Sequence, residues 1–249
     1  LLDRRAWIFH NSYMLKFLIP TAKEMAELSP VSQHFQTEKS NLIAQTTAKL
    51  SSSELEEVYK IKAEPAAKEA LRWRSLAKQE ANYFPALKLF NGLMYRNMDR
   101  DFLTDLANID QKVFITSALY GVIPAMTPIA PHRLDFNTKL KIDGASLKQF
   151  WRPDYDQALT SEDTVISLLS SEFEDVFSPQ KRQQLTSIQF REIQDGKTKT
   201  HSTISKKARG QFLTQALKND CQNLDDLKMI EFNGFRYNDK LSQTKLLVF

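Results

Sequence analysis

The sequence predicts a mixed α+β fold in a single domain, on three observations. Short apolar or alternating stretches are interspersed with stretches of helical spacing, without the regular β-α-β period of a doubly wound sheet. The 249 residues are 42% apolar and 26% charged, as in a soluble globular protein. Sixteen phenylalanines against six glycines indicate a well-packed interior. No repeat or low-complexity stretch divides the chain.

The first 13 residues, LLDRRAWIFHNSY, stand apart from the rest. They contain Arg4 and Arg5 but no apolar core of signal-peptide length and no small-residue cleavage pattern. The following MLKFLIPTAKEM begins like a first strand, so we interpret Met14 as the natural start. We expect residues 1–13 to be a cloning remnant or upstream translation, and residues 14–249 to form the domain.

The N-terminal part of this domain predicts one strand followed by helices. LKFLI (15–19) is short, apolar and bounded by Pro20, as a buried strand would be. Ser53, with Glu56 three residues later, matches a capping box at the start of a helix. A second helix has Pro65 near its start and apolar residues at helical spacing, namely Ala67, Leu71 and Leu76.

The middle of the chain is rich in turns. Residues 85–98 predict a strand or short helix around a turn at Asn91–Gly92. The stretch 112–136 combines an apolar, strand-like run ending in Gly121 with three later prolines. That proline spacing forbids a long helix and favours a rigid, extended connection.

The second half alternates short helices and strands. SLKQFWRPDYDQALTSED predicts one or two short helices broken at Pro153. Residues 165–169 predict a buried strand that runs into a helix entered through Ser170 or Ser171. Asp195–Gly196, flanked by alternating apolar and polar residues, predicts a two-residue β-hairpin. KKARGQFLTQALKND is expected to be helical, and LLVF to close the chain as a strand.

Most standard chemical sites are absent from the sequence, which has no phosphate loop, dinucleotide glycine pattern, zinc spacing or Gly-x-Ser-x-Gly motif. The single cysteine, Cys221, excludes an internal disulfide and favours a reducing interior. His34, His132 and His201 lie far apart, so we expect hydrogen-bonding or surface histidines rather than metal ligands. No apolar run approaches the roughly 18–20 residues that span a bilayer. We therefore expect no cofactor, no metal and no membrane association.

The stretch TISKKARGQF (203–212) is a candidate anion site. Lys206, Lys207 and Arg209 lie within four residues, and in a helix Lys206 and Arg209 would share a face. We expect the run in the first turn of a helix, where cations oppose the macrodipole. A bound anion there would gain from free backbone N–H groups. An ordinary solvated helix face is the alternative; the net charge of +4 is compatible with a polyanionic partner.

Two other groups of polar residues have both a structural and a functional interpretation. Arg133 and Asp135 would lie on one face of an extended segment, and a local ion pair is the simpler explanation. Ser170 and Glu172 follow a predicted strand, where catalytic and phosphate-binding groups often lie, although helix capping explains them as well. The aromatic stretch 149–151 is expected to belong to the core rather than to a base-stacking platform.

Taken together, these segments resemble the YaaA peroxide-stress family of bacterial proteins, of the UPF0246 type. MLKFLIPTAKEM is similar to the family's N-terminal strand and turn. NGLMY, LYGV, PHRLDF, LKQFW, VISLLSSEF, SKKARG and the closing FNGFRYN and LLVF follow in the family's order and at similar spacing. The resemblance covers residues 14–249. It implies an unusual single-domain α+β fold with a positively charged cleft, and DNA binding through a helix-hairpin-helix-like element.

The resemblance also implies site residues, in five elements of the family pattern. These are the N-terminal lysine, the Leu-Tyr-Gly turn, the Arg-Leu-acid element, the strand-end pair and the basic run. The matching positions are Lys23, Tyr120, Gly121, Arg133, Asp135, Ser170, Glu172, Lys206, Lys207 and Arg209.

The function implied is that of a cytoplasmic peroxide-stress protein that limits iron-dependent oxidative damage and binds double- or single-stranded DNA through a basic cleft. Lys206, Lys207 and Arg209 would neutralise phosphates, and the cleft would be lined by Lys23, Arg133, Tyr120 and Gly121. No stable protein partner is implied. The alternative is an enzyme acting on a phosphorylated or nucleotide substrate in the same cleft, with Asp135, Ser170 and Glu172 as catalytic candidates. A deep, closed pocket would favour the enzyme, and a long open groove the DNA-binding protein.

Overall fold

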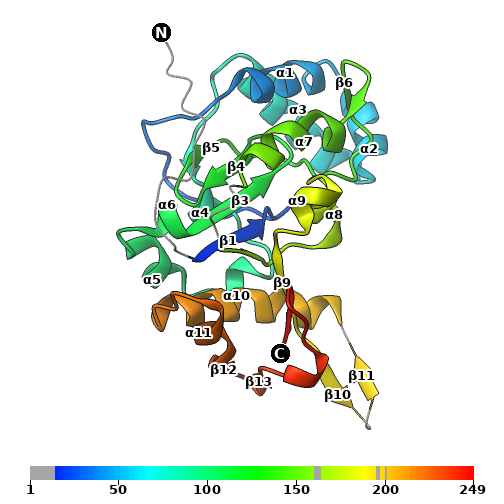
Figure 1. Ribbon diagram of the computed structural model, residues 1–249. Coiled ribbons are helices and arrows are strands. Elements are labelled where there is room, and N and C mark those ends of the chain that lie inside the picture. Colours follow the sequence, from blue (N-terminus) through cyan, green and yellow to red (C-terminus); the bar gives the residue numbers. More distant parts are fainter. Residues whose placement is uncertain (1–14, 160–163, 195–196, 200) are drawn as a thin grey trace.

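A six-stranded sheet forms the centre of the computed structural model, which describes residues 15–159, 164–194, 197–199 and 201–249 (Figure 1). The strand order across the sheet is β14-β9-β8-β1-β3-β4. The bounds are β1 (Leu15–Pro20), β3 (Val113–Ser117), β4 (Gly121–Pro124), β8 (Thr164–Ser167), β9 (Thr186–Gln189) and β14 (Leu246–Val248). The α+β class predicted from the sequence is confirmed.

Five of these six strands run parallel, and only β4 pairs antiparallel, with β3. From β1 the chain moves outward to β3 and β4, then returns to the other side of β1 and continues through β8, β9 and β14. The direction of winding therefore reverses between β1 and β8. In open, mostly parallel sheets, ligands bind outside the carboxyl ends of the strands at such a switch point.

The central strands are buried because their sequences are nearly continuous apolar runs, as expected for parallel strands covered on both faces. Phe17, Leu18 and Ile19 are at most 1% exposed. All five residues of β3 are buried. The predicted strand at residues 15–19 is confirmed as β1, and the strand predicted at 165–169 is confirmed over residues 165–167, since β8 ends at Ser167.

The connection from β1 to β3 is mainly helical. It contains α1 (Glu38–Thr47), α2 (Ser52–Tyr59), α3 (Ala63–Ala77), β2 (Phe84–Pro85), α4 (Ala86–Leu89), η1 (Tyr95–Asn97), α5 (Arg100–Asp105) and α6 (Ile109–Lys112). Figure 1 shows α1, α2 and α3 on one side of the sheet, above β3 and β4.

Two sequence predictions for these helices were wrong. The capping box of α2 is Ser51 with Glu54, not the pair two residues later, because the helix begins earlier than the serine run alone could indicate. The buried face of α3 includes Ala66, Ala70 and Trp73, whereas Leu71 is 64% exposed. A residue spacing defines a helical face, but which face is buried depends on what packs against it.

The proline in α7 (Leu147–Gln157) does not break the helix, contrary to the sequence prediction. Hydrogen bonds to the segment after β3 hold the helix on both sides of Pro153. Trp151 Nε1 donates to the carbonyl of Ala118 at 2.8 Å, and Tyr155 Oη donates to the carbonyl of Ser117 at 3.1 Å. These two bonds offset the one backbone bond that proline removes.

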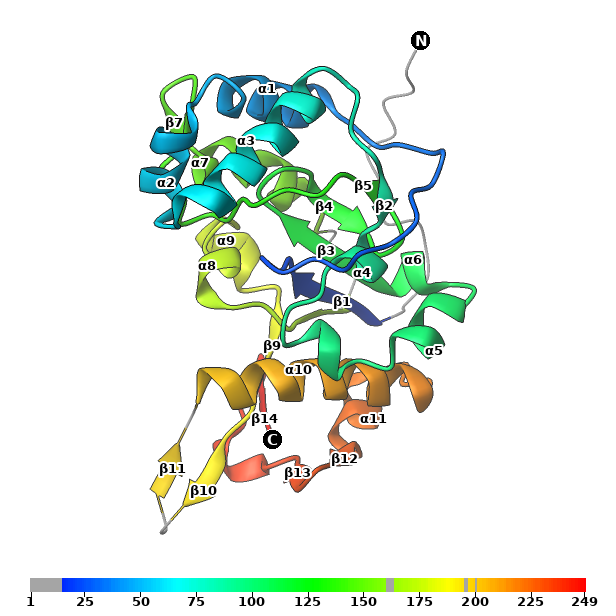
Figure 2. The ribbon, with the colours of Figure 1, turned by 180° about the vertical axis from the view of Figure 1, so that it is seen from behind.

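The C-terminal part contains the predicted hairpin and a long helix. β10 (Glu192–Gln194) pairs antiparallel with β11 (Lys197–Lys199), and the predicted turn residues Asp195–Gly196 lie outside the described residues. α10 (Ser202–Lys218) follows and lies along one side of the sheet, and the hairpin projects beyond it (Figures 1 and 2).

The remaining elements are short. They are β5 (Pro128–Ile129), β6 (Lys141–Ile142), β7 (Ala145–Ser146), α8 (Ser171–Glu174), α9 (Pro179–Arg182), α11 (Leu224–Lys228), β12 (Glu231–Phe232), β13 (Phe235–Arg236) and η2 (Asp239–Leu241). Among the described residues, no helix has the length and apolar character needed to cross a bilayer.

Candidate functional site

Three charged side chains from distant parts of the chain meet where the winding of the sheet reverses. Lys23 follows β1, Glu172 follows β8, and Asp135 lies in the connection between β5 and β6. Lys23 Nζ lies 2.8 Å from Asp135 Oδ2. The backbone N–H of Phe136 donates to Glu172 Oε1 at 3.0 Å, which places Glu172 beside the same segment. We call Lys23, Asp135 and Glu172 the switch-point cluster.

The two carboxylates of this cluster experience different environments. Burial alone would raise the pKa of Asp135, but the hydrogen bond and charge of Lys23, with donors from Thr138 and Asn137, lower it below its ordinary value. The pKa of Glu172 is raised, first by burial and then by the negative charge of Asp135. Opposite shifts in neighbouring carboxyl groups are the usual arrangement for one proton acceptor and one proton donor.

Removing the Lys23 ammonium, as in Lys23→Met, should raise the pKa of Asp135, because the burial cost then has no opposing cation. The lowered pKa in the folded state stabilises the protein above the unfolded pKa, and this contribution is lost as the pH falls; the variant should lose it. Carboxyl ¹³C titration by NMR measures the shift. Lys39→Met, which removes the ion pair with Asp154, is the matched control and should leave Asp135 unchanged. An unaltered Asp135 titration in Lys23→Met would show that Lys23 does not lower the pKa of Asp135.

Arg133 and Ser170 are each two residues in sequence from a member of this cluster, Asp135 and Glu172 respectively. The backbone N–H of Arg133 donates to Glu69 Oε2 at 2.9 Å, and its guanidinium lies 6.0 Å from the ring centroid of Tyr59. Arg133 and Asp135 have opposite effects on the pKa of Tyr59: Arg133 lowers it and Asp135 raises it. Ser170 is the N-cap residue of α8, but its side chain makes no capping hydrogen bond. Its hydroxyl is therefore not committed to the cap.

Tyr120 and Gly121 have structural roles in the turn between β3 and β4. Tyr120 is 3% exposed, and its hydroxyl accepts a hydrogen bond from the backbone N–H of Ala130 at 3.1 Å. Gly121 has a φ of +79°, and a Cβ there would lie 2.8 Å from the ring of Trp151. Only glycine fits both the conformation and the space. The same tryptophan is 3% exposed, as the core interpretation of the aromatic stretch predicted.

The basic run lies in the second turn of α10 rather than the first, because the helix already begins at Ser202. Lys206 and Lys207 are exposed, and within the described part of the chain neither takes part in an ion pair or hydrogen bond. Arg209 is half-buried, and its Nε is enclosed without a hydrogen-bond partner among the described residues. Lys206 and Arg209 therefore differ in exposure, although they are three residues apart.

Arg209 is oriented toward the sheet. Burial lowers its pKa, and the charge of Glu174 opposes that shift. Glu174 Oε1 in turn accepts hydrogen bonds from the hydroxyls of Ser167 and Ser187, the latter at 3.1 Å. α8 thus carries Glu172 toward the switch-point cluster and Glu174 toward α10, and it connects the two groups of charges.

The positive charge of the chain is concentrated in residues 191–209, which we call the basic segment. It comprises Arg191, the β10–β11 hairpin and the beginning of α10. The segment contains six lysines and arginines against two acidic residues, an excess equal to the net charge of +4 of the whole chain. The other residues are therefore balanced in charge. From the sequence, only Lys206, Lys207 and Arg209 of this segment were predicted to bind an anion.

Two pockets among the described residues lie away from the switch-point cluster. One of about 510 Å³ is lined by residues near the end of the chain, including Arg191 and Arg236. Another of about 260 Å³ lies between residues 31–34 and 79–83. The described residues contain no group of three or more His, Cys, Asp or Glu side chains placed to hold a metal ion. The first pocket was not indicated by the sequence, because its lining comes from separate turns.

The family described as "Peroxide stress protein YaaA" matches residues 15–241. A UPF0246 protein of Streptococcus agalactiae is 50% identical over 238 residues, covering 95% of this chain and 98% of the relative. A UPF0246 protein of Streptococcus thermophilus is 50% identical over 239 residues, covering 95% and 97%. One of Streptococcus pyogenes is 50% identical over 231 residues, covering 92% and 95%.

Proposed function

This chain belongs to the YaaA family of peroxide stress proteins, and from that premise we propose that it binds DNA through its basic segment and so limits iron-dependent oxidative damage in the bacterial cytoplasm. The family name supports a role in peroxide stress. DNA is a polyanion and a target of iron-dependent oxidative damage. The charge distribution of this chain supports DNA as its ligand.

The observation that carries the proposal is the concentration of all excess positive charge in the basic segment. Other lysines near α10 are paired with carboxylates: Lys218 with Asp99 at 2.6 Å, and Lys112 with Asp220 at 2.9 Å. Lys206 and Lys207 have no such partner in the described part of the chain. Cations in the N-terminal half of a helix do not benefit from its dipole. Their placement is therefore better explained by an external anion than by stability.

The shape of the segment is compatible with a large partner. The β10–β11 hairpin projects from the body of the protein, and the beginning of α10 lies next to it (Figures 1 and 2). The exposed Lys206 and Lys207 on α10 can reach phosphates along a strand without the protein closing around it. Such contacts position the nucleic acid without reading its sequence.

Removal of the two exposed lysines, in Lys206→Ala/Lys207→Ala, should weaken DNA binding and flatten its dependence on salt. Each phosphate contact contributes about 0.9 to the slope of log K against log salt, so the slope should fall by about two units. Fluorescence anisotropy with a labelled duplex of about 20 base pairs, between about 50 and 200 mM salt, measures it.

The matched control is Lys68→Ala/Arg74→Ala, which removes two exposed cations from α3 at the opposite side of the sheet. It should retain the wild-type slope. A wild-type protein that does not bind DNA at low salt would overturn the proposal. Equal slopes in both double variants would remove Lys206 and Lys207 from the interface.

A further inference from the structure

The pocket of about 510 Å³ combines features that differ from an ordinary surface crevice. It lies at the carboxyl ends of β9 and β14, against the turn between β12 and β13. Its lining includes two arginines, Arg191 and Arg236, two partly buried aromatic residues, Phe235 and Tyr237, the buried Phe249, and Asn233. Its volume is in the range of pockets that bind small organic ligands. Because Arg191 is the first residue of the basic segment, the pocket lies at the base of that segment.

The two aromatic rings are supported on one side by the core. Phe235 lies 5.5 Å from Phe190 and 5.5 Å from Phe232, measured between ring centroids. Tyr237 lies 6.0 Å from Phe249 in an edge-to-face arrangement. Both rings are half-buried and also line the pocket. Contacts with core rings hold both in place before anything binds, which reduces the entropic cost of stacking on them.

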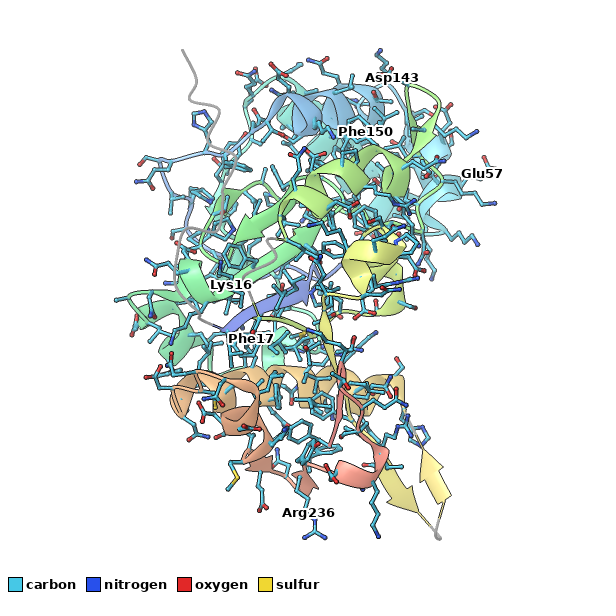
Figure 3. The ribbon with its side chains drawn as sticks, viewed as in Figure 1. Lys16, Phe17, Glu57, Asp143, Phe150 and Arg236 are labelled. Atoms are coloured by element: carbon cyan, nitrogen blue, oxygen red, sulfur yellow. The ribbon has the colours of Figure 1, made fainter. Side chains whose placement is uncertain are left out.

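The two guanidinium groups are available to an anion. Arg191 donates from Nη2 to the side chain of Gln189 at 3.0 Å, and Arg236 lines the pocket and is exposed at the protein surface (Figure 3). Neither forms an ion pair with a carboxylate within the described residues. One carboxylate side chain, that of Glu192, also lines the pocket beside the two guanidinium groups. Guanidinium groups suit phosphate because they can donate two parallel hydrogen bonds.

From these features we propose that the pocket binds one unpaired nucleotide, with its base stacked on Phe235 and Tyr237 and its phosphate paired with Arg191 and Arg236. An inorganic anion would leave the aromatic surface unused, and an apolar ligand would leave the two cations without a partner. A nucleotide satisfies both. Where the nucleotide belongs to a DNA strand, the inference rests on the proposed function, and single-stranded DNA is the favoured ligand. A free nucleotide is the other source of the same chemistry.

The test compares DNA ligands that have unpaired bases with ligands that lack them. Anisotropy is measured with labelled oligothymidylate of about 12 nucleotides, an abasic strand of the same length and a duplex. Stacking of one base on an aromatic side chain is worth about 5- to 100-fold in affinity. The abasic strand should therefore bind at least about fivefold more weakly than oligothymidylate. Thymidine monophosphate, added as a competitor and titrated by calorimetry, reports on the free nucleotide.

The variants separate stacking from charge. Tyr237→Leu should weaken binding of oligothymidylate about tenfold, Tyr237→Phe should retain it, and neither should change duplex affinity. Arg236→Gln should weaken the binding of both oligothymidylate and the monophosphate. Arg74→Gln, which replaces a matched exposed arginine on α3, should change the affinity for neither. Thermal unfolding of each variant verifies that it is folded.

The outcomes distinguish this inference from the proposed function. If the duplex binds but oligothymidylate responds neither to loss of its bases nor to Tyr237→Leu, the pocket inference is overturned and DNA binding stands. If no strand binds but the monophosphate does, and Tyr237→Leu weakens it, DNA binding fails and the pocket is a site for a free nucleotide. If neither strands nor the monophosphate bind, both are overturned.

Discussion

Replacing Gly210 with alanine should destabilise the protein by about 3 kcal/mol, although alanine is the better helix former. A Cβ at this position in α10 would lie 2.2 Å from the carbonyl oxygen of Met94 and 3.1 Å from the carbonyl carbon of Asn97. Both are backbone atoms that cannot rotate away, so the helix itself must move. The gain in helix propensity, about 1 kcal/mol, is too small to compensate.

The close approach at Gly210 positions the rest of α10. Thr214, one turn further, accepts a hydrogen bond from the backbone N–H of Asp99 at 3.1 Å, and Gln211 reaches the side chain of Asn97 at 3.4 Å. These contacts fix the helix against the segment that contains η1. Because the basic run immediately precedes Gly210, displacement of the helix should also weaken DNA binding.

Urea unfolding of Gly210→Ala and Lys207→Ala measures the effect within one helix. Lys207 is exposed, so its replacement should change the free energy of unfolding by less than about 0.5 kcal/mol. A Gly210→Ala protein as stable as the Lys207→Ala control would mean that the helix does not approach η1 this closely. The glycine that ends SKKARG thus has a structural explanation, independent of any ligand.

Local patterns identified individual elements, but not how they pair. The strand at 15–19 and the hairpin around Asp195–Gly196 depend on residues next to each other in the sequence, so composition was sufficient. The continuous α7 could not be predicted, because bonds from Trp151 and Tyr155 to residues 117–118 hold it together across its proline. Tertiary contacts overrode the local preference.

The candidate site shows the same limit. Asp135 and Glu172 were named from local patterns and Lys23 from the family resemblance, but their meeting point depends on the pairing of β1 with β8, where Leu15 lies opposite Thr164. No local pattern reveals a pairing across that distance in sequence. The burial of Arg209 was missed for a related reason. Helical spacing placed it on the face of Lys206, but the packing of α10 beside Glu174 encloses it.

Acid should destabilise the protein through His132, whose pKa is lowered to about 4 by burial. The ring is 2% exposed, donates from Nδ1 to the carbonyl of Ala130 at 2.8 Å in the neutral form, and lies among Trp73, Phe90 and Tyr120. The hydrogen bond favours the protonated form and the charge of Arg72 opposes it, but burial has the largest effect.

The sign of the effect follows from the two pKa values. The unfolded chain binds a proton at His132 near pH 6.5, whereas the folded protein does so only near pH 4. Between these values the unfolded state carries more protons, so the free energy of unfolding should fall by about 3 kcal/mol as the pH is lowered from 6.5 to 4. Above pH 6.5 this group should have no influence on stability.

The variant that isolates this contribution is His132→Asn, whose amide can still donate to the Ala130 carbonyl but cannot titrate. It will be less stable at neutral pH, so the informative quantity is the slope of unfolding free energy against pH, which should be shallower between pH 6.5 and 4. Carboxylates such as Asp135 contribute equally to both proteins. Identical slopes would show that His132 titrates normally and is reached by water. Because His132 is adjacent to Arg133 and three residues from Asp135, its neutral ring anchors the segment that brings Asp135 to Lys23.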